Sequence, residues 1–203
     1  MNILAKIISY LFHPLFVPLY AVLLFFQLNA YTLLNYPWSL KIIVILIVFI
    51  TTILVPFLLT YLFYRKKYLV SFEMHNKEER NLPFIVTSIF YFITYNMFNQ
   101  LKLPSIFQLF MLGGCILTVV LLFINYKWKI SVHLAGIGTL VGAFIAISLL
   151  YSIEIPFLIH VLIIVSGLIG FARLQLNSHT PLQIYTGFLL GAGGMFLMLF
   201  LLA

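Results

Sequence analysis

Three polar side chains lie between two long apolar segments, at a spacing that could support chemistry on an oxyanion. Arg173 and His179 are six positions apart, and Gln183 follows the histidine by four. An arginine guanidinium can bind an oxyanion through two parallel hydrogen bonds, and an imidazole can act as a nucleophile or carry a proton. Four residues make about one helical turn, so we expect Gln183 to orient the imidazole from the start of a helix. Phosphate is the oxyanion that this set of residues favours.

The composition places these side chains at a membrane. The chain of 203 residues is 64% hydrophobic and only 7% charged, and several of its runs approach or exceed the roughly 20 apolar residues that span a bilayer. Ionisable groups beside a bilayer core are costly and are therefore candidates for function. We expect an all-α, polytopic membrane helix bundle of six or seven transmembrane helices. We also expect a single transmembrane domain over residues 1–203, because no linker or polar second domain is visible.

The charge balance points to lipid and to an anionic substrate. The formal net charge is +7, but the basic residues lie at the ends of apolar segments and do not cluster on one soluble face. Headgroup anchoring and binding of an anion explain this distribution better than nucleic acid does. The single cysteine, Cys115, lies inside an apolar run, so an intramolecular disulfide is excluded.

Seven apolar segments must position these side chains. The first is interrupted by prolines beside His13, which is expected to satisfy backbone groups that Pro14 frees. Gly138 and Gly142, and later two more glycines at the same four-residue spacing, predict helices that approach each other closely. The expected segments are 7–28, 40–64, 82–98, 105–126, 130–152, 155–171 and 181–203. The third and fourth, within 82–126, could also be re-entrant and not cross the membrane.

Counting the crossings brings the polar residues to one membrane face. With seven crossings, the connections at 65–81, 126–131 and 172–181 lie on the same side as the N-terminus. The polar residues that could take part in chemistry then lie on that side, and they are Lys77, Arg80, Ser131, His133, Arg173 and His179.

In this order and spacing, the residues resemble the type 2 phosphatidic acid phosphatases (PAP2), a superfamily that also includes the vanadium haloperoxidases. The third signature of that family fits best, as Arg173, five residues, His179, three residues and Gln183. The second survives as a Ser-x-His around Ser131 and His133, without the family's Pro and Gly. The first signature is matched only loosely, by Lys77, Arg80 and Pro83. The resemblance spans roughly residues 65–200. The sequence around these motifs is similar to that of small membrane proteins of this family from Bacteroidetes-type bacteria.

The resemblance implies a lipid phosphatase that hydrolyses a lipid phosphate or pyrophosphate without a metal or other cofactor. His179 would attack phosphorus and form a phosphohistidine, and His133 would protonate the leaving group and then activate water. Hydrogen bonds and charge on the phosphate oxygens would come from four residues, namely Lys77, Arg80, Ser131 and Arg173. Gln183 stands where the family has an Asp. Its carbonyl can accept from the imidazole but supplies no negative charge. From the same side, only Glu73, Glu78 or Glu79 could replace that charge.

Four other readings stay open. The serious rival is a catalytically inactive subunit that binds lipid phosphate or serves the assembly of a membrane complex. A zinc site on His75, His133 and His179 is conceivable, although no acidic residue has the spacing of helical metal motifs. A transporter or channel lacks the expected internal repeats. Arg173, Lys77 and Arg80 could each be ordinary headgroup anchors.

The distribution of basic residues also predicts an orientation. The side that carries the candidate site has six further basic residues, against Lys41 and Lys102 on the opposite side. The positive-inside rule then places the site at the cytoplasmic surface of a bacterial inner membrane, whereas most membrane members of the family face the other way. The six residues are Lys6, Arg65, Lys66, Lys67, Lys127 and Lys129.

Overall fold

The structure, a computed structural model, describes residues 2–28, 36–68 and 77–203, and every regular element within these ranges is a helix. Glu73, a candidate for the missing carboxylate charge, and His75, a candidate zinc ligand, lie outside the described residues. Six of the described helices are long and apolar enough to cross a membrane: Ile3–Phe25, Trp38–Arg65, Ser105–Lys127, Val132–Tyr151, Pro156–Gln175 and Pro181–Leu202. The chain is therefore an all-α integral membrane protein, as its composition predicts.

The first apolar segment is broken at the predicted prolines. It consists of α1 (Asn2–Leu11), a 3-10 turn (Pro14–Phe16) and α2 (Val17–Phe25). His13 precedes a proline and has the extended backbone that this position favours, with φ −64° and ψ 140°. Its Nδ1 accepts a hydrogen bond from the Leu15 N–H at 3.3 Å. The imidazole thus satisfies backbone at the proline break, which is the structural role predicted for it.

The second segment contains a π-helical turn that its apolar pattern does not predict. It runs as α3 (Trp38–Val48), the π turn (Phe49–Leu54) and α4 (Val55–Arg65). Pro56 lies in the first turn of α4 and cannot donate to a carbonyl in the preceding turn, a common cause of a local change in helical winding. In the π turn, the hydroxyl of Thr51 donates to Ile47 O at 2.7 Å and that of Thr52 to Val48 O at 2.8 Å.

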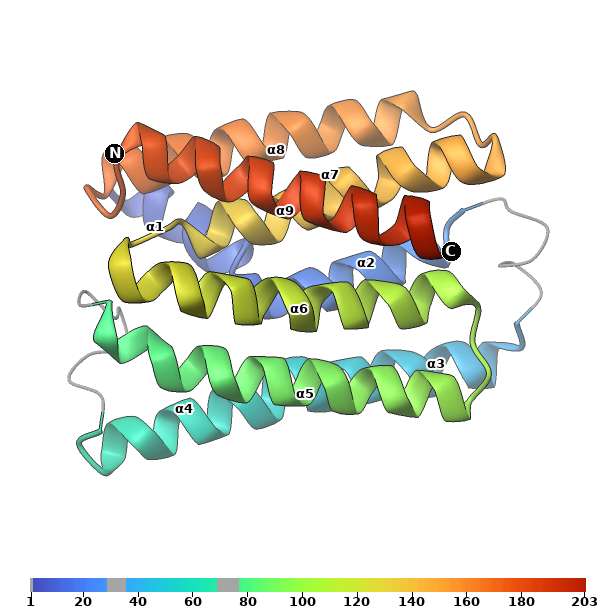
Figure 1. Ribbon diagram of the computed structural model, residues 1–203, viewed down its shortest axis with the longest axis horizontal. Coiled ribbons are helices and arrows are strands. Elements are labelled where there is room, and N and C mark those ends of the chain that lie inside the picture. The colour runs from blue at the N-terminus through green and yellow to red at the C-terminus, as the bar shows by residue number, and fades with distance from the viewer. Residues whose placement is uncertain (1, 29–35, 69–76) are drawn as a thin grey trace. The chain divides into compact units, whose positions relative to one another are not determined.

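Two antiparallel helices follow, α5 (Asn81–Gln100) and α6 (Ser105–Lys127), which lie side by side (Figure 1). A short 3-10 turn (Glu78–Arg80) leads into α5. Unlike α6, α5 is not apolar enough to count among the six candidate spans. Its 20 residues nevertheless make a helix of about 30 Å, the thickness of a bilayer's hydrocarbon core.

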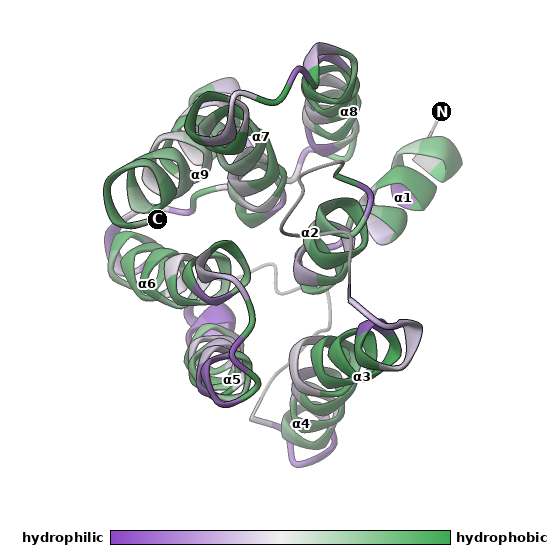
Figure 2. Ribbon diagram, turned by 90° about the vertical axis from the view of Figure 1, so that its right-hand side faces the viewer, coloured by the Kyte–Doolittle hydropathy of each residue, from purple (hydrophilic) through white to green (hydrophobic). Residues whose placement is uncertain are grey.

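The helices fall into two compact units. The first comprises Met1–Val17 and Ile130–Ala203, and the second Pro18–Lys129. The first unit holds α1 and the three C-terminal helices, α7 (Val132–Tyr151), α8 (Pro156–Gln175) and α9 (Pro181–Leu202). Figure 2, which looks along the helices, shows that these three helices consist mostly of apolar residues.

In the first unit, α7 and α9 lie side by side and run in the same direction (Figure 1). The helix that connects them in the sequence, α8, runs in the opposite direction. The predicted close approach at the glycines is confirmed. A Cβ added at Gly138 would lie 2.5 Å from Phe188 O, and one at Gly187 would lie 2.6 Å from Ser131 O. At Gly142 and Gly191 an added Cβ would meet the backbone of the opposite helix more closely still. Because the contact is backbone to backbone, it sets the start of α7 beside the start of α9.

Candidate functional site

The turn between α8 and α9 spaces Arg173 from His179. The N–H of Ser178 donates to Arg173 O at 3.1 Å, and that of Asn177 donates to Leu174 O at 2.9 Å. These two bonds form a Schellman motif, which needs a left-handed residue after the helix. Asn177 fills that place with φ 49°, and asparagine tolerates this conformation better than most residues. The five intervening residues therefore make a compact reversal that holds the guanidinium and the imidazole near the same helix end.

Gln183 holds the imidazole of His179, as the four-residue spacing predicts. Its Oε1 lies 3.1 Å from His179 Nδ1 and also accepts the Thr180 N–H at 3.1 Å. The second bond is half of a capping box at the start of α9. Since this oxygen only accepts, Nδ1 carries the imidazole proton and the lone pair of the neutral ring is on Nε2. The side chain of His179 is buried, with 7% of its surface exposed.

Ser131 lies against the same part of α9. Its N–H donates to Gln183 O at 3.3 Å, and the close contact with Gly187 holds it there. The side chain is fully buried, and its Oγ has no hydrogen-bond partner among the residues that the structure describes. A buried hydroxyl without a partner is costly, so this oxygen is suited to binding a polar ligand.

His133, at the start of α7, is held by the first helix. Its Nε2 lies 3.2 Å from Ser9 O, and because a carbonyl only accepts, Nε2 must carry a proton. The ring also meets that of His13 edge to face, with 5.5 Å between centroids. From α8, Arg173 Nη1 donates to Ser9 Oγ at 3.5 Å. The ends of α1 and α8 and the starts of α7 and α9 thus meet at one cluster.

Sequence reasoning misses two members of this cluster. Thr180 could have been found, because Thr-x-x-Gln before an apolar run is the signature of a capping box. Ser9 has no such signal, since a single serine in an apolar helix is usually bonded to its own backbone. What matters for Ser9 is its position at the end of α1, which only the fold reveals.

The structure brings five of the predicted site residues together and leaves two in the other unit. The five are Ser131, His133, Arg173, His179 and Gln183, all in the first unit. Lys77 and Arg80 belong to the second unit. There, Lys77 Nζ donates to Tyr126 O at 2.7 Å, and Asn125 Nδ2 donates to Lys77 O at 2.6 Å. Lys77 thus binds a carbonyl at the C-terminal end of α6, where a positive charge is stabilised by the helix dipole. Arg80 is buried, with 9% exposed.

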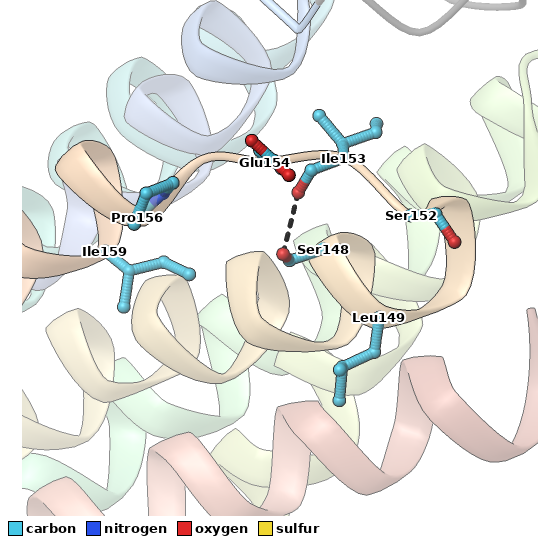
Figure 3. A pocket seen from close by; sticks show the side chains of 7 residues that line it. All are labelled: Ser148, Leu149, Ser152, Ile153, Glu154, Pro156 and Ile159. Atoms are coloured by element: carbon cyan, nitrogen blue, oxygen red, sulfur yellow. Dashed lines mark hydrogen bonds between the residues drawn. The ribbon is translucent and has the colours of Figure 1, made fainter.

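An open pocket of about 540 Å³ lies at the other end of the first unit, where α7 turns into α8 (Figure 3). Ser148 Oγ closes this turn by donating to Ile153 O at 2.7 Å. The pocket contains no cation or imidazole, so the polar cluster at the opposite helix ends is the better candidate site. The lining residues are Ser148, Leu149, Ser152, Ile153, Glu154, Pro156 and Ile159.

The fold and the cluster together define an all-α integral membrane protein in which an oriented, buried imidazole, a guanidinium and a buried hydroxyl belong to one cluster of helix ends. Comparison with known proteins finds no match: no family model, curated protein or solved structure is significantly similar to this chain.

Proposed function

We propose that this protein is a membrane lipid phosphatase of the PAP2 type, which hydrolyses a lipid phosphate or pyrophosphate through a phosphohistidine. The observation that carries the proposal is the hydrogen bond between His179 Nδ1 and Gln183 Oε1. A histidine nucleophile needs one ring nitrogen protonated and oriented so that the other presents its lone pair. The bond to Gln183 supports that arrangement for Nε2.

The first step is in-line attack on the substrate. His179 Nε2 donates its lone pair to phosphorus, the bond from phosphorus to the leaving oxygen breaks, and a phosphohistidine forms. Charge develops on the non-bridging oxygens during this step, and Arg173 and the hydroxyl of Ser131 are the groups in the cluster that can stabilise it. Water then attacks the phosphohistidine, which releases phosphate and restores the imidazole.

His133 is the candidate general acid and base. Its Nε2–H is bonded to Ser9 O, so the nitrogen that remains for proton transfer is Nδ1. In the imidazolium form Nδ1 would protonate the leaving oxygen, and in the neutral form it would accept a proton from the attacking water.

The resemblance adds two elements that rest on the sequence alone. Lys77 and Arg80 would contribute further positive charge to the phosphate, in keeping with the family's first signature. By the positive-inside rule, the count of basic residues would place the site at the cytoplasmic surface of a bacterial inner membrane. The lipid tail of the substrate would enter from the bilayer between helices.

A second function, binding of lipid phosphate or a part in membrane-complex assembly without turnover, is favoured by one observation. The oxygen that orients His179 belongs to a neutral amide and is shared with the Thr180 N–H. It therefore offers the imidazolium less stabilisation than a carboxylate would. Lipid phosphate binding without phosphate release would identify this function.

The test is phosphate release by the purified protein in detergent, with phosphatidic acid, phosphatidylglycerol phosphate, a polyprenyl pyrophosphate and lipid A phosphate as substrates. We expect release from at least one lipid, lost in His179→Ala and retained in His160→Ala. His160 is a suitable control because it is exposed on α8 and its Nδ1 lies 2.6 Å from Pro156 O in its own helix. Release that survives His179→Ala would refute the assignment of the nucleophile.

A further inference from the structure

We infer that Ser9, in the first helix, is a positioning residue of this site, an inference that rests on the proposed phosphatase function. Its hydroxyl accepts from Arg173 and its carbonyl accepts from His133. One residue thus contacts both the group that would bind phosphate and the group that would transfer protons. Neither contact follows from the family signatures, all of which lie beyond residue 65.

The carbonyl of Ser9 is available because of the way α1 ends. In a continuous helix it would accept the N–H of His13. Here the N–H of Phe12 still bonds to Ile8 O at 3.0 Å, but that of His13 turns to Tyr10 O at 3.3 Å. The last turn of α1 tightens to a 3-10 bond, as helix C-termini often do, so the bonding pattern skips Ser9. His133 then supplies the donor that the helix end lacks.

The hydroxyl of Ser9 is buried where a polar group is costly. Ser9 has 6% of its surface exposed, and the donor that reaches its Oγ is Arg173 Nη1, at 3.5 Å. Such a bond restricts the rotamers of a long side chain before substrate arrives. Hydrogen bonds at catalytic sites are often long without substrate and shorten when it binds, so this contact would orient the guanidinium towards the phosphate.

The two contacts can be separated by mutation. Ser9→Ala removes the Oγ that Arg173 contacts and leaves the carbonyl that His133 contacts. We therefore expect weaker binding of the phosphate group, which appears as a higher KM, together with a smaller fall in kcat, because Arg173 also faces the charge that develops during the attack. The expected increase in KM is about tenfold, the size of one lost hydrogen bond to a charged group. Ser9→Thr keeps a hydroxyl and should restore KM.

The matched control is Ser166→Ala. Ser166 is also a buried serine of the first unit, but its Oγ donates to Leu162 O in its own helix at 2.7 Å. The four proteins (wild type, Ser9→Ala, Ser9→Thr and Ser166→Ala) are compared in nanodiscs with the lipid that gives most phosphate release. A second readout, independent of turnover, is the ¹⁵N spectrum of the arginine side chains. The sequence has three arginines, Arg65, Arg80 and Arg173, so the signals are simple to assign.

The inference is supported if Ser9→Ala shifts the Arg173 signal and raises KM while Ser9→Thr and Ser166→Ala behave as wild type. It is overturned if the Arg173 signal is unchanged in Ser9→Ala, whatever the activity. It is also overturned if the signal shifts but KM does not, because Ser9 would then be a structural contact only. Wild-type protein that neither releases phosphate nor binds inorganic phosphate in a ³¹P titration would refute the proposed function itself, and Ser9's role with it.

Discussion

A single oxygen, Gln183 Oε1, serves both a helix end and the candidate nucleophile. It completes the capping box with Thr180 and accepts from His179 Nδ1. A substitution of Gln183 is therefore expected to affect both stability and activity. The two effects can be separated by comparing it with a substitution that disrupts the capping box but keeps the acceptor of the His179 N–H.

Gln183→Ala and Thr180→Ala form such a pair. Each breaks one of the two bonds of the capping box, so each should lower the free energy of unfolding by about 0.5–2 kcal/mol. Only Gln183→Ala also removes the acceptor of the His179 N–H, so we expect phosphate release to fall at least about tenfold further in this variant. Unfolding midpoints in detergent and initial rates on the same lipid check the two effects. Equal rates in the two variants would contradict the orienting role.

Gln183→Glu tests the missing charge. A glutamate side chain keeps the length and the acceptor oxygen, and adds a negative charge beside the His179 ring, which becomes positively charged when Nε2 bonds to phosphorus. We expect stability to change little and kcat to rise by about ten- to a hundredfold, well within the roughly four orders of magnitude that the opposite replacement costs a serine protease. A matched Gln175→Glu variant adds the same charge at the end of α8, and should leave kcat unchanged.

At the scale of the helix, the contact between α7 and α9 positions Ser131 and Gln183. A methyl group at Gly191 would overlap Ala135 O on α7, whereas one at Gly193, two residues on along the same helix, meets nothing within 4 Å. We expect Gly191→Ala to destabilise the protein by about 1–3 kcal/mol or more and to reduce phosphate release. Gly193→Ala should be neutral or stabilising by up to about 1 kcal/mol, because alanine has the higher helix propensity.

Thermal unfolding of the two variants in the same detergent gives the comparison. Equal stability of Gly191→Ala and Gly193→Ala would contradict the close approach of the α7 and α9 backbones at Gly191.

In the second unit, a pair of threonines links the π turn to α5. The hydroxyls of Thr51 and Thr94 lie 2.7 Å apart, both buried. A hydrogen bond between membrane helices contributes about 0.6 kcal/mol on average and at most about 1.7. We expect a coupling energy in that range from a double-mutant cycle of Thr51→Val and Thr94→Val, measured by unfolding in detergent. Zero coupling would show that the two hydroxyls do not bond.

Most helices of this fold follow from sequence patterns, because long apolar runs and prolines act locally. The break beside Pro14 and the start of α9 at Pro181 are examples. The glycine spacing also predicts the close helix contact correctly, since only small residues permit it. The π turn at 49–54 is not predicted, because its cause is a loss of one backbone donor with several possible local responses.

The candidate site is predictable only in part, for a similar reason. The contact of His179 with Gln183 follows from their spacing along one chain segment. The contacts of Ser9 with His133 and Arg173 join positions more than 120 residues apart, and no local pattern encodes them. What decides them is which backbone carbonyl remains without a partner at the end of α1, and that depends on packing.

At the scale of the whole molecule, the number of crossings depends on α5. Its start lies beside the end of α6, where Lys77 contacts Tyr126 O, and its length suits a bilayer despite its lower apolar content. Single cysteines at Lys66, Lys102 and Lys127 in a Cys115→Ala background decide the matter. With an impermeant maleimide on intact cells and inverted vesicles, we expect positions 66 and 127 to react from the cytoplasmic side and position 102 from the other. Reaction of 66 and 102 from the same side would mean that α5 does not cross.

The contact of α7 with α9 also has a consequence for biosynthesis. The two helices are separated along the chain by α8, so α7 enters the bilayer before its partner has been translated. Its glycine and alanine face, which lies against α9 in the finished protein, must meanwhile meet lipid or the insertion machinery. Ser131 and His133 are therefore inserted early, while His179 and Gln183, together with the α9 backbone that positions Ser131, arrive later. A chain whose synthesis stalls within α8 would be anchored in the membrane without the candidate nucleophile and the glutamine that orients it.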